Sequence, residues 1–344
     1  QDGEEAHMVF KFPNGRPLGK VISAVEKDQI DGREVWRMQV RRLFGDASRG
    51  VTNVVVDAED LSPIRTDVWH SQLGAASTSF SDGSATITRP QHDEPQVSDV
   101  VNPIFENDSV GFFFRRLPFD IGYTGNARLF VSFTGQQLDL GLTVPQIDTI
   151  TTSLGDIPSY RVDLSINQKA WIAVDGPRYG TKAEMGGIVG TLTEVLTRRR
   201  SDPVSYSNTF AEYHLPPDWA LFDRGEKGEI VSQVELQDPR AAAFGMIRIK
   251  SSKVSEEELD IAARIQAAIK DNQETLGTYE VTGLETEESG STDTGRYIGH
   301  FELSGKKMVH YRSFLLTEDA WVKILFLVPE DQLEDLRESM DSIM

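Results

Sequence analysis

Residues 108–123 read DSVGFFFRRLPFDIGY, and this stretch decides the fold of the first half of the chain. Asp108 is of a type that caps helices and Pro118 of a type that stops them, so the sequence predicts a short helix between them. Successive helical residues point about 100° apart, so the three phenylalanines at 112–114 cover roughly 200° of the helix surface. One flat sheet cannot bury all three rings, and we expect a second surface against them.

The sequence on both sides of this stretch has the pattern of β-strands. From Val9 to about Leu196 apolar and polar residues mostly alternate, in short segments that Gly, Asp, Ser and Pro interrupt. Alternation with a period of two is typical of strands with one buried face, and the interruptions are turn residues. We therefore predict a curved antiparallel sheet that offers the helix more than one surface.

Residues 197–208, TRRRSDPVSYSN, have little to bury and mark a boundary between two domains. We predict a first domain over 1–197, a linker over 198–207 and a second domain over 208–344. The length of 344 residues agrees with this division, because one hydrophobic core rarely serves more than about 250–300 residues.

The second domain mixes helical and strand patterns. Residues 255–273 open with a capping box of Ser255 and Glu258, and residues 329–344 begin at Pro329, so we predict a helix in each range. Their apolar faces consist of Leu259, Ala262, Ile265 and Ile269, and of Leu333, Leu336, Met340 and Ile343. Strand patterns lie between the two helices. The fold class is therefore α+β, with an antiparallel sheet flanked by helices.

The composition is that of an acidic globular chain without cysteine. Lys and Arg number 35 against 54 Asp and Glu, a formal charge of −19, and residues 201–344 hold 14 of the basic and 28 of the acidic residues. A field of this sign repels phosphate backbones, so we expect no nucleic-acid partner. We interpret the three arginines at 198–200 as part of a solvated linker. The absence of cysteine excludes disulfides and thiolate metal sites.

Two features favour a periplasmic or extracellular location. The sequence starts at Gln1 with a polar lead, as a chain does after removal of a signal peptide, and a cysteine-free composition suits an oxidising compartment. No run of about 18 apolar residues is present, so we expect no transmembrane segment. Whether a lipidated cysteine once preceded this start stays open.

No catalytic signature is present, and we expect a protein that is not an enzyme. The nucleophile elbow and the dinucleotide, Walker A and zinc-protease patterns are all missing. His300 and Glu302 share one strand face, as a metal pair would, but His310 on the next strand is expected to point the other way. HDEP at 92–95 has metal-ligand side chains, but we interpret it as a polar loop. DVWHS at 67–71 contains the residue types of a serine hydrolase, but neighbouring side chains in a strand point to opposite faces, so His70 cannot readily serve Ser71. We predict no catalytic residue, no metal site and no cofactor.

Aromatic residues gather in the alternating segments of the first domain. We expect Trp36, Trp69, Trp171 and Phe133 on the concave face of the sheet, and Phe112, Phe113, Phe114 and Leu117 of the helix against them. A single sheet with this many aromatic residues needs something large against it. Either these side chains fill the core, or they line a cavity for a hydrophobic or lipid-like ligand, and the sequence leaves both possibilities open.

Five segments of the first half follow, in order, the pattern of a known group of proteins. They are DGREVWRMQV, VDAEDLSPIRTDVW, FFFRRLPFDIGYTG, SLGDIPSYRVDL and AWIAVDGPRYGTKAEM, with matching positions at Asp57, Leu61, Pro63, Arg116, Leu117, Pro118, Gly122, Gly155, Trp171, Asp175 and Arg178. Residues 8–196 thus resemble an uncharacterised family of bacterial envelope proteins related to the LolA/LolB lipoprotein carriers. The resemblance implies a half-barrel wrapped partly around a helical plug, with an apolar interior that in the carriers accepts acyl chains. Neither a lipoprotein-release partner nor a lipidated N-terminal cysteine is visible in the sequence.

The second half is similar to the PsbP-like fold. Residues 206–221, YSNTFAEYHLPPDWAL, resemble its opening strand and its Leu-Pro-x-x-Trp turn, with Leu215, Pro216 and Trp219 in the matching positions. This resemblance implies an accessory binding module. We therefore expect a non-enzymatic protein that binds a hydrophobic or lipid-like ligand in its first domain. The alternative is a structural or assembly module whose acidic second domain docks onto a protein partner.

Overall fold

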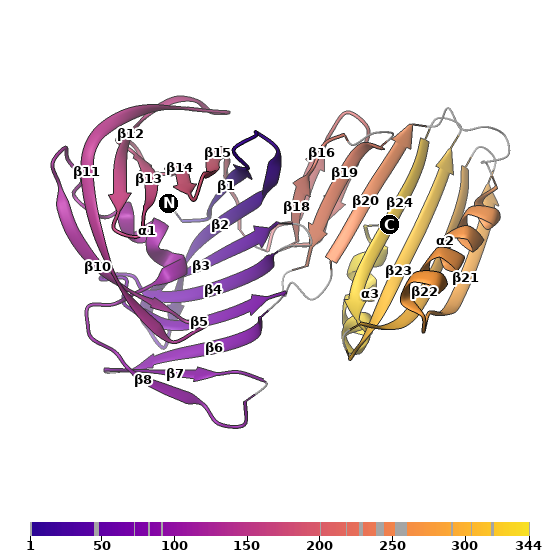
Figure 1. Ribbon diagram of the computed structural model, residues 1–344, viewed down its shortest axis with the longest axis horizontal. Helices are drawn as coiled ribbons and strands as arrows, with labels where there is room; N and C mark the ends of the chain where they lie inside the picture. The colour runs from indigo at the N-terminus through magenta and orange to yellow at the C-terminus, as the bar shows by residue number, and fades with distance from the viewer. Residues whose placement is uncertain are drawn as a thin grey trace. The chain divides into compact units, whose positions relative to one another are not determined.

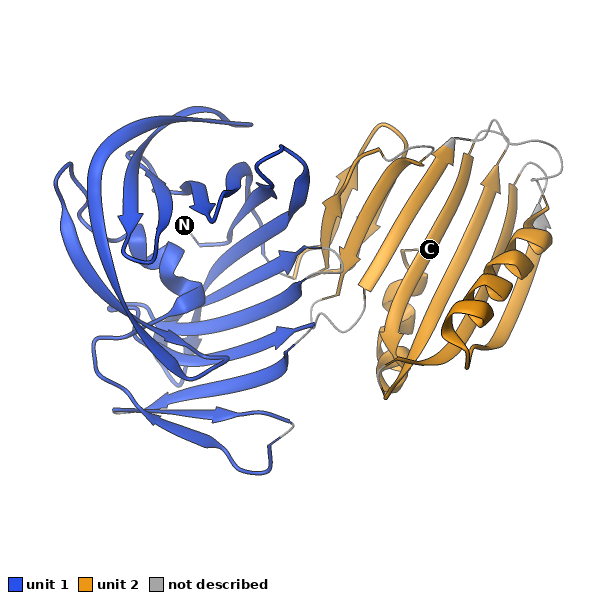
Figure 2. Ribbon diagram, in the orientation of Figure 1, with its two compact units in different colours: residues 1–200 blue, residues 201–344 orange. Residues whose placement is uncertain are grey.

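The computed structural model describes residues 2–44, 48–71, 73–81, 83–90, 92–199, 201–217, 219–226, 230–238, 244–251, 260–289, 292–303, 305–317 and 320–343. The chain divides into two compact units, 1–200 (unit 1) and 201–344 (unit 2), which Figure 2 colours separately. The range 198–207, which we expect to be a linker, includes strand β16 (Val204–Ser207) of unit 2. None of the helices in these ranges is long and apolar enough to cross a membrane.

The described strands of unit 1 form one sheet. In chain order they are β1 (Glu4–Lys11), β2 (Pro17–Ile30), β3 (Arg33–Leu43), β4 (Arg49–Asp57), β5 (Pro63–His70), β6 (Gly74–Ser81), β7 (Ser84–Thr88), β8 (Gln96–Asp99), β9 (Phe105–Glu106), β10 (Thr124–Val131), β11 (Gln136–Thr152), β12 (Gly155–Leu164), β13 (Gln168–Ala173), β14 (Gly180–Met185) and β15 (Ile188–Thr197). Two meanders, β1 to β8 and β10 to β15, join where β1 pairs with β15. Every neighbouring pair is antiparallel except β9 with β10, so the predicted antiparallel sheet is confirmed.

Tight turns with positive φ connect several of these strands. Between β2 and β3, Asp31 and Gly32 have φ values of 51° and 80°. Positive φ at both central residues defines the type I′ turn, whose twist matches that of the strands it joins. Gly186 and Gly187, with φ of 56° and 84°, connect β14 to β15 in the same way. Glycine adopts this conformation without the steric cost of a Cβ atom.

A short helical segment lies within the curve of this sheet (Figure 1). It consists of a 3₁₀ turn, η1 (Asn107–Ser109), and α1 (Val110–Phe114). The predicted helix is therefore confirmed, but it ends before Pro118 and Asp108 does not cap it. The carboxylate of Glu106 caps the segment instead, because it accepts a hydrogen bond from the backbone N–H of Asp108.

The three adjacent rings of α1 contact three different surfaces. Phe113 stacks on Phe105 of β9, with ring centroids 3.9 Å apart, and Phe112 lies 5.4 Å from Trp36 of β3. Phe114 is 3% exposed and belongs to a cluster with residues from both meanders. We call this set the plug cluster; its buried members are Val25, Met38, Val54, Val56, Leu61, Phe113, Phe114, Phe119, Ala127, Leu129, Leu140, Leu142, Val144, Val162 and Ile172. The sheet thus supplies the second surface that the sequence requires.

The two meanders also meet at one end of unit 1 through side chains. Phe80 of β6 packs edge-on against Phe130 of β10, with centroids 5.2 Å apart, and Phe130 is fully buried. The hydroxyl of Thr78 donates to the backbone carbonyl of Ser132 over 3.2 Å. These contacts join β6 to β10 without ladder hydrogen bonds, so the sheet has the form of a half-barrel around α1.

Unit 2 contains a two-stranded sheet and a seven-stranded antiparallel sheet over its described residues. Its elements are β16, β17 (Glu212–Leu215), β18 (Ala220–Asp223), β19 (Ile230–Gln237), β20 (Phe244–Ser251), α2 (Ile261–Leu276), β21 (Glu280–Ser289), β22 (Thr292–Leu303), β23 (Lys306–Thr317), β24 (Ala320–Pro329), η3 (Glu330–Gln332) and α3 (Leu333–Asp341). The larger sheet has the order β18-β19-β20-β24-β23-β22-β21. The α+β class predicted for this half is confirmed.

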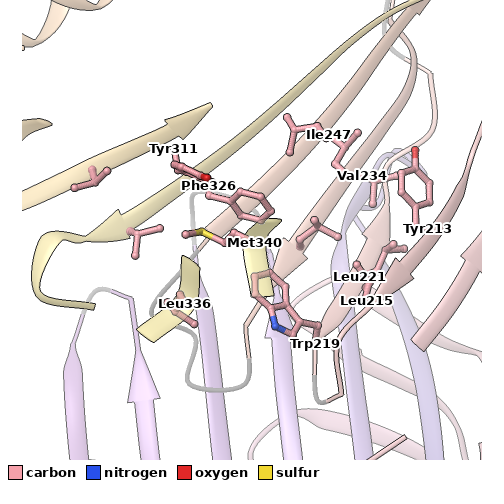
Figure 3. Packing of buried hydrophobic residues seen from close by; sticks show 14 of the residues in the cluster. Tyr213, Leu215, Trp219, Leu221, Val234, Ile247, Tyr311, Phe326, Leu336 and Met340 are labelled. Carbon is pink, nitrogen blue, oxygen red and sulfur yellow. The ribbon is translucent and has the colours of Figure 1, made fainter. Parts of the chain in front are cut away.

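The two helices of unit 2 pack on opposite faces of the sheet. On β23, Val309 and Tyr311 belong to the cluster of α3, whereas Phe314 and Leu316 belong to the cluster of α2. Odd and even residues of one strand point to opposite faces, so each helix covers one face. Figure 3 shows the α3 side, where Leu336 and Met340 lie near Trp219 and Phe326.

The predicted apolar faces of the helices are borne out in part. Leu333, Leu336 and Met340 of α3 are buried, and Ile343 packs partly buried against the same cluster. In α2 the buried residues are Ile261, Ile265 and Ile269, whereas Ala262 is exposed, contrary to our expectation. The helix begins later than predicted, because the carboxylate of Asp260 caps it by accepting from the N–H of Ala263. The predicted cap residues Ser255 and Glu258, together with Leu259, lie outside the described residues.

Replacement of Phe114 by Ala tests whether the plug holds unit 1 together. The change removes a ring that is 3% exposed, and we expect the free energy of unfolding of unit 1 to fall by about 3–5 kcal/mol. Urea unfolding followed by tryptophan fluorescence measures this loss. The control is Ile121→Ala, because Ile121 is 59% exposed, and equal stability of the two variants would contradict a plug-centred core.

Candidate functional site

A pocket of about 740 Å³ opens between α1 and the loops at one end of the half-barrel. It is lined by Lys27, Arg33, Glu34, Trp36, Asp57, Ala58, Glu59, Phe112, Arg115, Arg116 and Pro177. Pockets of about 300–1,000 Å³ are the usual size for small-molecule sites. We call this the outer pocket. Its lining combines two aromatic rings with seven charged side chains.

A second, smaller hollow lies between α1 and the concave face of β1, β2 and β3. It has a volume of about 140 Å³. Its lining includes the apolar residues Ala6, Met8, Val25, Met38 and Val40, together with the charged residues Glu4, Asp108 and Arg115. An apolar cavity of about 150 Å³ in another protein stays dry and binds benzene, so this inner hollow has room for a short hydrocarbon segment.

Phe112 and Arg115 line both the outer pocket and the inner hollow. They lie one turn apart on and just after α1, so the helix sets the position of both. Phe112 is only half-buried, unlike the two rings that follow it. A ligand that enters the outer pocket therefore meets the inner hollow at these two side chains.

Arg115 is fixed by a buried ion pair. Its two Nη atoms contact the two carboxylate oxygens of Glu4 at 2.7 and 2.8 Å, and its Nε donates to the carbonyl of Pro177 at 2.9 Å. The guanidinium also lies over the rings of Phe112 and Tyr179, at 5.6 and 5.1 Å from their centroids. Glu4 is 3% exposed, and removal of one partner from such a pair leaves a buried charge, at a cost of about 3–5 kcal/mol.

The other cations of the outer pocket are arranged around its rim. Arg33 donates from Nε to Asp57 at 2.5 Å, and the Nζ of Lys27 lies 5.2 Å from the Trp36 ring. Arg116 is exposed and donates to the carbonyl of Ala58 at 3.2 Å. Neither Lys27 nor Arg116 forms an ion pair with another described residue. Two positive charges of the rim are thus available to an anionic group.

The other end of the plug is held by two acidic side chains inside the half-barrel, Asp108 and Glu106. Asp108 accepts from the hydroxyl of Thr52 at 2.5 Å and forms an ion pair with Arg42. Glu106 is 2% exposed, and burial together with the nearby Asp108 raises the pKa of its carboxyl to about 8. Burial thus favours the protonated form of Glu106, beside the ion pair of Asp108 and Arg42.

The structure brings only some of the predicted site residues together. Phe112 and Trp36 line the outer pocket, whereas Phe113 and Phe114 are buried in the plug cluster and Leu117 packs against it. The rings of one helix are thus divided between the core and the lining of a pocket.

Trp69, Trp171 and Phe133 lie elsewhere, contrary to our expectation. On β5, Thr66 pairs with Val54 of the plug cluster, so Trp69, three residues later, points to the convex face. Trp171 follows the same rule, because its neighbour Ile172 belongs to the plug cluster. Phe133 packs in the separate cluster around Phe130 and Ile87.

Trp171 has polar partners on the convex face. Its Nε1 donates to the carboxylate of Asp148 at 2.7 Å, and the Nζ of Lys182 lies 4.2 Å from its ring. A strand tryptophan can therefore find a hydrogen-bond acceptor and a cation on the convex face, so its presence in the sequence does not indicate the concave face. The resemblance position Arg178 has a clearer role, because it donates to the carbonyl of Leu117 at 2.6 Å and so ties the loop after α1 to the strand end.

Several site residues carry no signal in the sequence. Glu4 lies 111 positions from its partner Arg115, and Met8 and Met38 read as ordinary strand residues. The arginines of 115–116 are the one available hint, since their place beside the rings predicts cations at a rim.

The histidines form no common site. His310 pairs across the ladder with Gly299, so it lies on the face opposite to His300, as predicted. His300 Nδ1 contacts Glu330 Oε1 at 2.8 Å. Among the described residues no group of three or more His, Cys, Asp or Glu side chains is arranged to hold a metal ion.

The fold and the site define a class of protein: a half-barrel around a helical plug, with a ligand-sized pocket beside the plug. The profile of the family described as "Protein of unknown function (DUF3108)" matches residues 6–197. The chain belongs to the DUF3108 family. No curated protein matches the sequence.

Solved structures show distant likenesses to the chain. Cyanobacterial PsbP from Synechocystis sp. PCC 6803 is 14% identical, with 42% of this chain and 89% of that chain covered and a TM-score of 0.34. A beta-barrel-like protein of the domain of unknown function DUF1849 from Brucella abortus is 8% identical, with 57% and 98% covered and a TM-score of 0.40. The MucA/MucB complex of Pseudomonas aeruginosa is 12% identical, with 97% of this chain and 91% of that chain covered and a TM-score of 0.24. TM-scores this low say nothing about what the present chain binds.

The buried carboxyl of Glu106 predicts a pH dependence of stability. Its pKa is higher in the folded than in the unfolded chain, so its contribution to stability is complete below about pH 4.5 and is lost as the pH rises toward about 8. The loss proceeds at up to about 1.4 kcal/mol per pH unit for one proton. Glu106→Gln removes this component, so its stability relative to the wild type should increase between pH 5 and pH 8.

Urea unfolding at a series of pH values measures this difference. Glu59→Gln is the matched control, because Glu59 is an exposed carboxylate of the same unit. Parallel pH profiles for Glu106→Gln and the wild type would show that Glu106 is ionised in the folded protein.

Proposed function

We propose that unit 1 binds an amphipathic, lipid-like ligand between α1 and strands β1 to β4, and that it does so without catalysis. The observation that carries this proposal is the meeting of the charged outer pocket and the mostly apolar inner hollow at Phe112 and Arg115. An apolar end of the ligand would occupy the hollow, and its polar end would stay in the outer pocket.

The charges of the outer pocket favour an acidic polar end. Lys27, Arg33, Arg115 and Arg116 line it together with three carboxylates. Arg33 and Arg115 already have carboxylate partners, whereas Lys27 and Arg116 have none among the described residues. A carboxylate or phosphate on the ligand would pair with these two cations, while Glu34 and Glu59 of the same lining keep the pocket as a whole close to neutral.

The proposal extends to the relation with the LolA/LolB carriers and to location. A sheet wrapped around a plug with an apolar hollow on its concave side is what that resemblance implies, and the hollow at Met38 supports it. The inner hollow of 140 Å³ is far smaller than a long acyl chain, so we propose that it takes the end of such a chain, or a shorter one. We place the protein in the periplasm or outside the cell, where lipid-like ligands in transit are met.

Replacement of Met38 by Trp tests the ligand proposal. The larger side chain fills the inner hollow, so we expect the affinity for dodecanoate to fall at least about tenfold, a change of 1.4 kcal/mol. Isothermal titration calorimetry below the micelle concentration measures it, and circular dichroism checks the fold, because overpacking costs about 1–3 kcal/mol.

The matched control for this experiment is Leu138→Trp, because Leu138 is 40% exposed and lies outside both pockets. Its affinity should equal that of the wild type. Equal dodecanoate affinity in Met38→Trp and Leu138→Trp would exclude the inner hollow as the binding site.

A second candidate function belongs to unit 2 and is the docking of a basic protein segment. A groove of about 590 Å³ runs along the edge strand β21 and is lined by Glu285, Glu287 and Asp341 with one cation, Arg296. The groove is thus acidic in a half-chain that already holds 28 acidic against 14 basic residues. We propose that this edge is the partner surface if the protein acts as an assembly module.

The double variant Glu285→Gln, Glu287→Gln tests the docking surface. We expect its affinity for a deca-lysine peptide to fall at least about fivefold, and the difference to shrink at high salt because exposed charges are screened. The control double variant Glu334→Gln, Glu338→Gln removes the same net charge from exposed positions of α3. Equal losses in the two double variants would show that only net charge matters.

A further inference from the structure

Three cations gather on the α2 face of the unit 2 sheet. Arg248 of β20 lies directly across the ladder from Lys323 of β24. Lys323 in turn lies opposite Phe314 of β23, and Arg312 is two residues before Phe314 on the same face, so it is the diagonal neighbour of Lys323. Because β20, β24 and β23 are adjacent strands (Figure 1), the three side chains form one cluster, which we call the cation cluster.

The cation cluster has no ion-pair partner among the described residues, and the one carboxylate that favours the charged form of Lys323 is Asp271 of α2. None of the ion pairs among the described residues of unit 2 includes Arg248, Arg312 or Lys323. Arg312 is only 6% exposed. Its Nη2 atom forms hydrogen bonds with two neutral groups, Asn272 Oδ1 at 3.1 Å and His310 Nδ1 at 3.3 Å. Unit 2 has twice as many acidic as basic residues, so a shortage of carboxylates does not explain the lack of a partner.

Buried hydrogen-bond donors in the cluster are also unsatisfied. The Nε atoms of Arg248 and Arg312 are buried without an acceptor. Trp321, two residues from Lys323 on the same face of β24, has a buried Nε1 that also lacks an acceptor. Buried donors in folded proteins normally have a partner, and each unpartnered one needs an explanation.

The cluster affects the titration of its own members. Burial, with help from Arg312 and Arg248, lowers the pKa of Lys323 to about 8. Burial, with help from Arg312 and Lys323, lowers the pKa of His310 to about 3. The cations therefore repel one another, and a bound anion would relieve this repulsion.

We propose that the cation cluster of Arg248, Arg312 and Lys323 binds a small oxyanion of the phosphate type, free or as a phosphomonoester. Guanidinium forks and an ammonium group are the donors that proteins use for phosphate oxygens, and charge-assisted hydrogen bonds of this kind are the strong ones. The site lies in unit 2 and is independent of the ligand proposed for unit 1. It gives the acidic unit 2 a site that attracts an anion.

Phosphate titration of the full chain tests the site. At pH 7 and constant ionic strength set with sodium chloride, we expect inorganic phosphate and glycerol 3-phosphate to give saturable binding in calorimetry and to raise the melting temperature of unit 2. In Lys323→Met and Arg248→Gln we expect the affinity for both to fall at least about tenfold. Binding of glycerol 3-phosphate alone would identify the phosphomonoester as the ligand class within the proposal.

The stability of Lys323→Met separates a binding site from a structural cluster. Without phosphate this variant should melt at a higher temperature than the wild type, because one of three mutually repelling cations is gone; with phosphate it should gain nothing. Arg248→Lys keeps the charge and should keep part of the affinity. The control Lys306→Met removes one exposed cation of the same unit and should bind as the wild type does. The proposal is overturned if the wild type binds neither phosphate compound, or if Lys306→Met loses as much affinity as Lys323→Met.

Discussion

The adjacency of three phenylalanines on one short helix is the constraint on which the structure of unit 1 depends. A helix of five residues, α1, has no stability of its own and is held by the packing of its side chains. Phe112, Phe113 and Phe114 point in different directions, so burial of the rings requires strands on several sides of the helix. The sheet meets this requirement by curling, which brings Phe80 of β6 against Phe130 of β10. The sheet therefore curls into a half-barrel partly because the rings of α1 need surfaces on several sides.

The charged residues at the two ends of the plug determine where its side chains lie. Asp108 is held by Arg42 and Thr52, and Arg115 is held by Glu4, so both anchor points are partly buried polar contacts. Such pairs contribute little net stability but are costly to break, so they select one position of the helix among many that hydrophobic packing alone would allow. That position leaves Phe112 half-buried between the two hollows. The pocket thus follows from electrostatics at the helix ends, and the core follows from the rings between them.

The sequence predicts the classes of structure here better than it predicts the site. Alternation of apolar and polar residues identifies strands because it depends only on residues close in sequence. The helix within 108–123 is predictable for the same reason. Alternation shows that two faces exist but not which face is concave: Trp36 points in, whereas Trp69 points out and the hydroxyl residue Thr66 is buried in its place. The pair Glu4 and Arg115 is beyond any local pattern, because it joins residues 111 positions apart through the closure of the sheet. The placement of His310 opposite to His300 was predictable, since it needs only the parity of one hairpin.

The cation cluster differs from the paired cations elsewhere in the chain, such as Arg42 and Arg115 of unit 1 and Arg224 of unit 2. In unit 1, Arg42 and Arg115 each face a carboxylate, although that unit is the less acidic half of the chain. Unit 2 has more carboxylates, yet the cation cluster forms no ion pair with any of them among the described residues. The carboxylate that acts on Lys323 is Asp271 of α2, which raises the pKa of Lys323. A cluster of this kind lowers the stability of the folded unit unless something anionic occupies it, and an anion that binds only the folded state restores stability by mass action. If the cluster binds an anion as we propose, the stability of unit 2 depends on the anion content of its surroundings, whereas burial of Glu106 links the stability of unit 1 to pH.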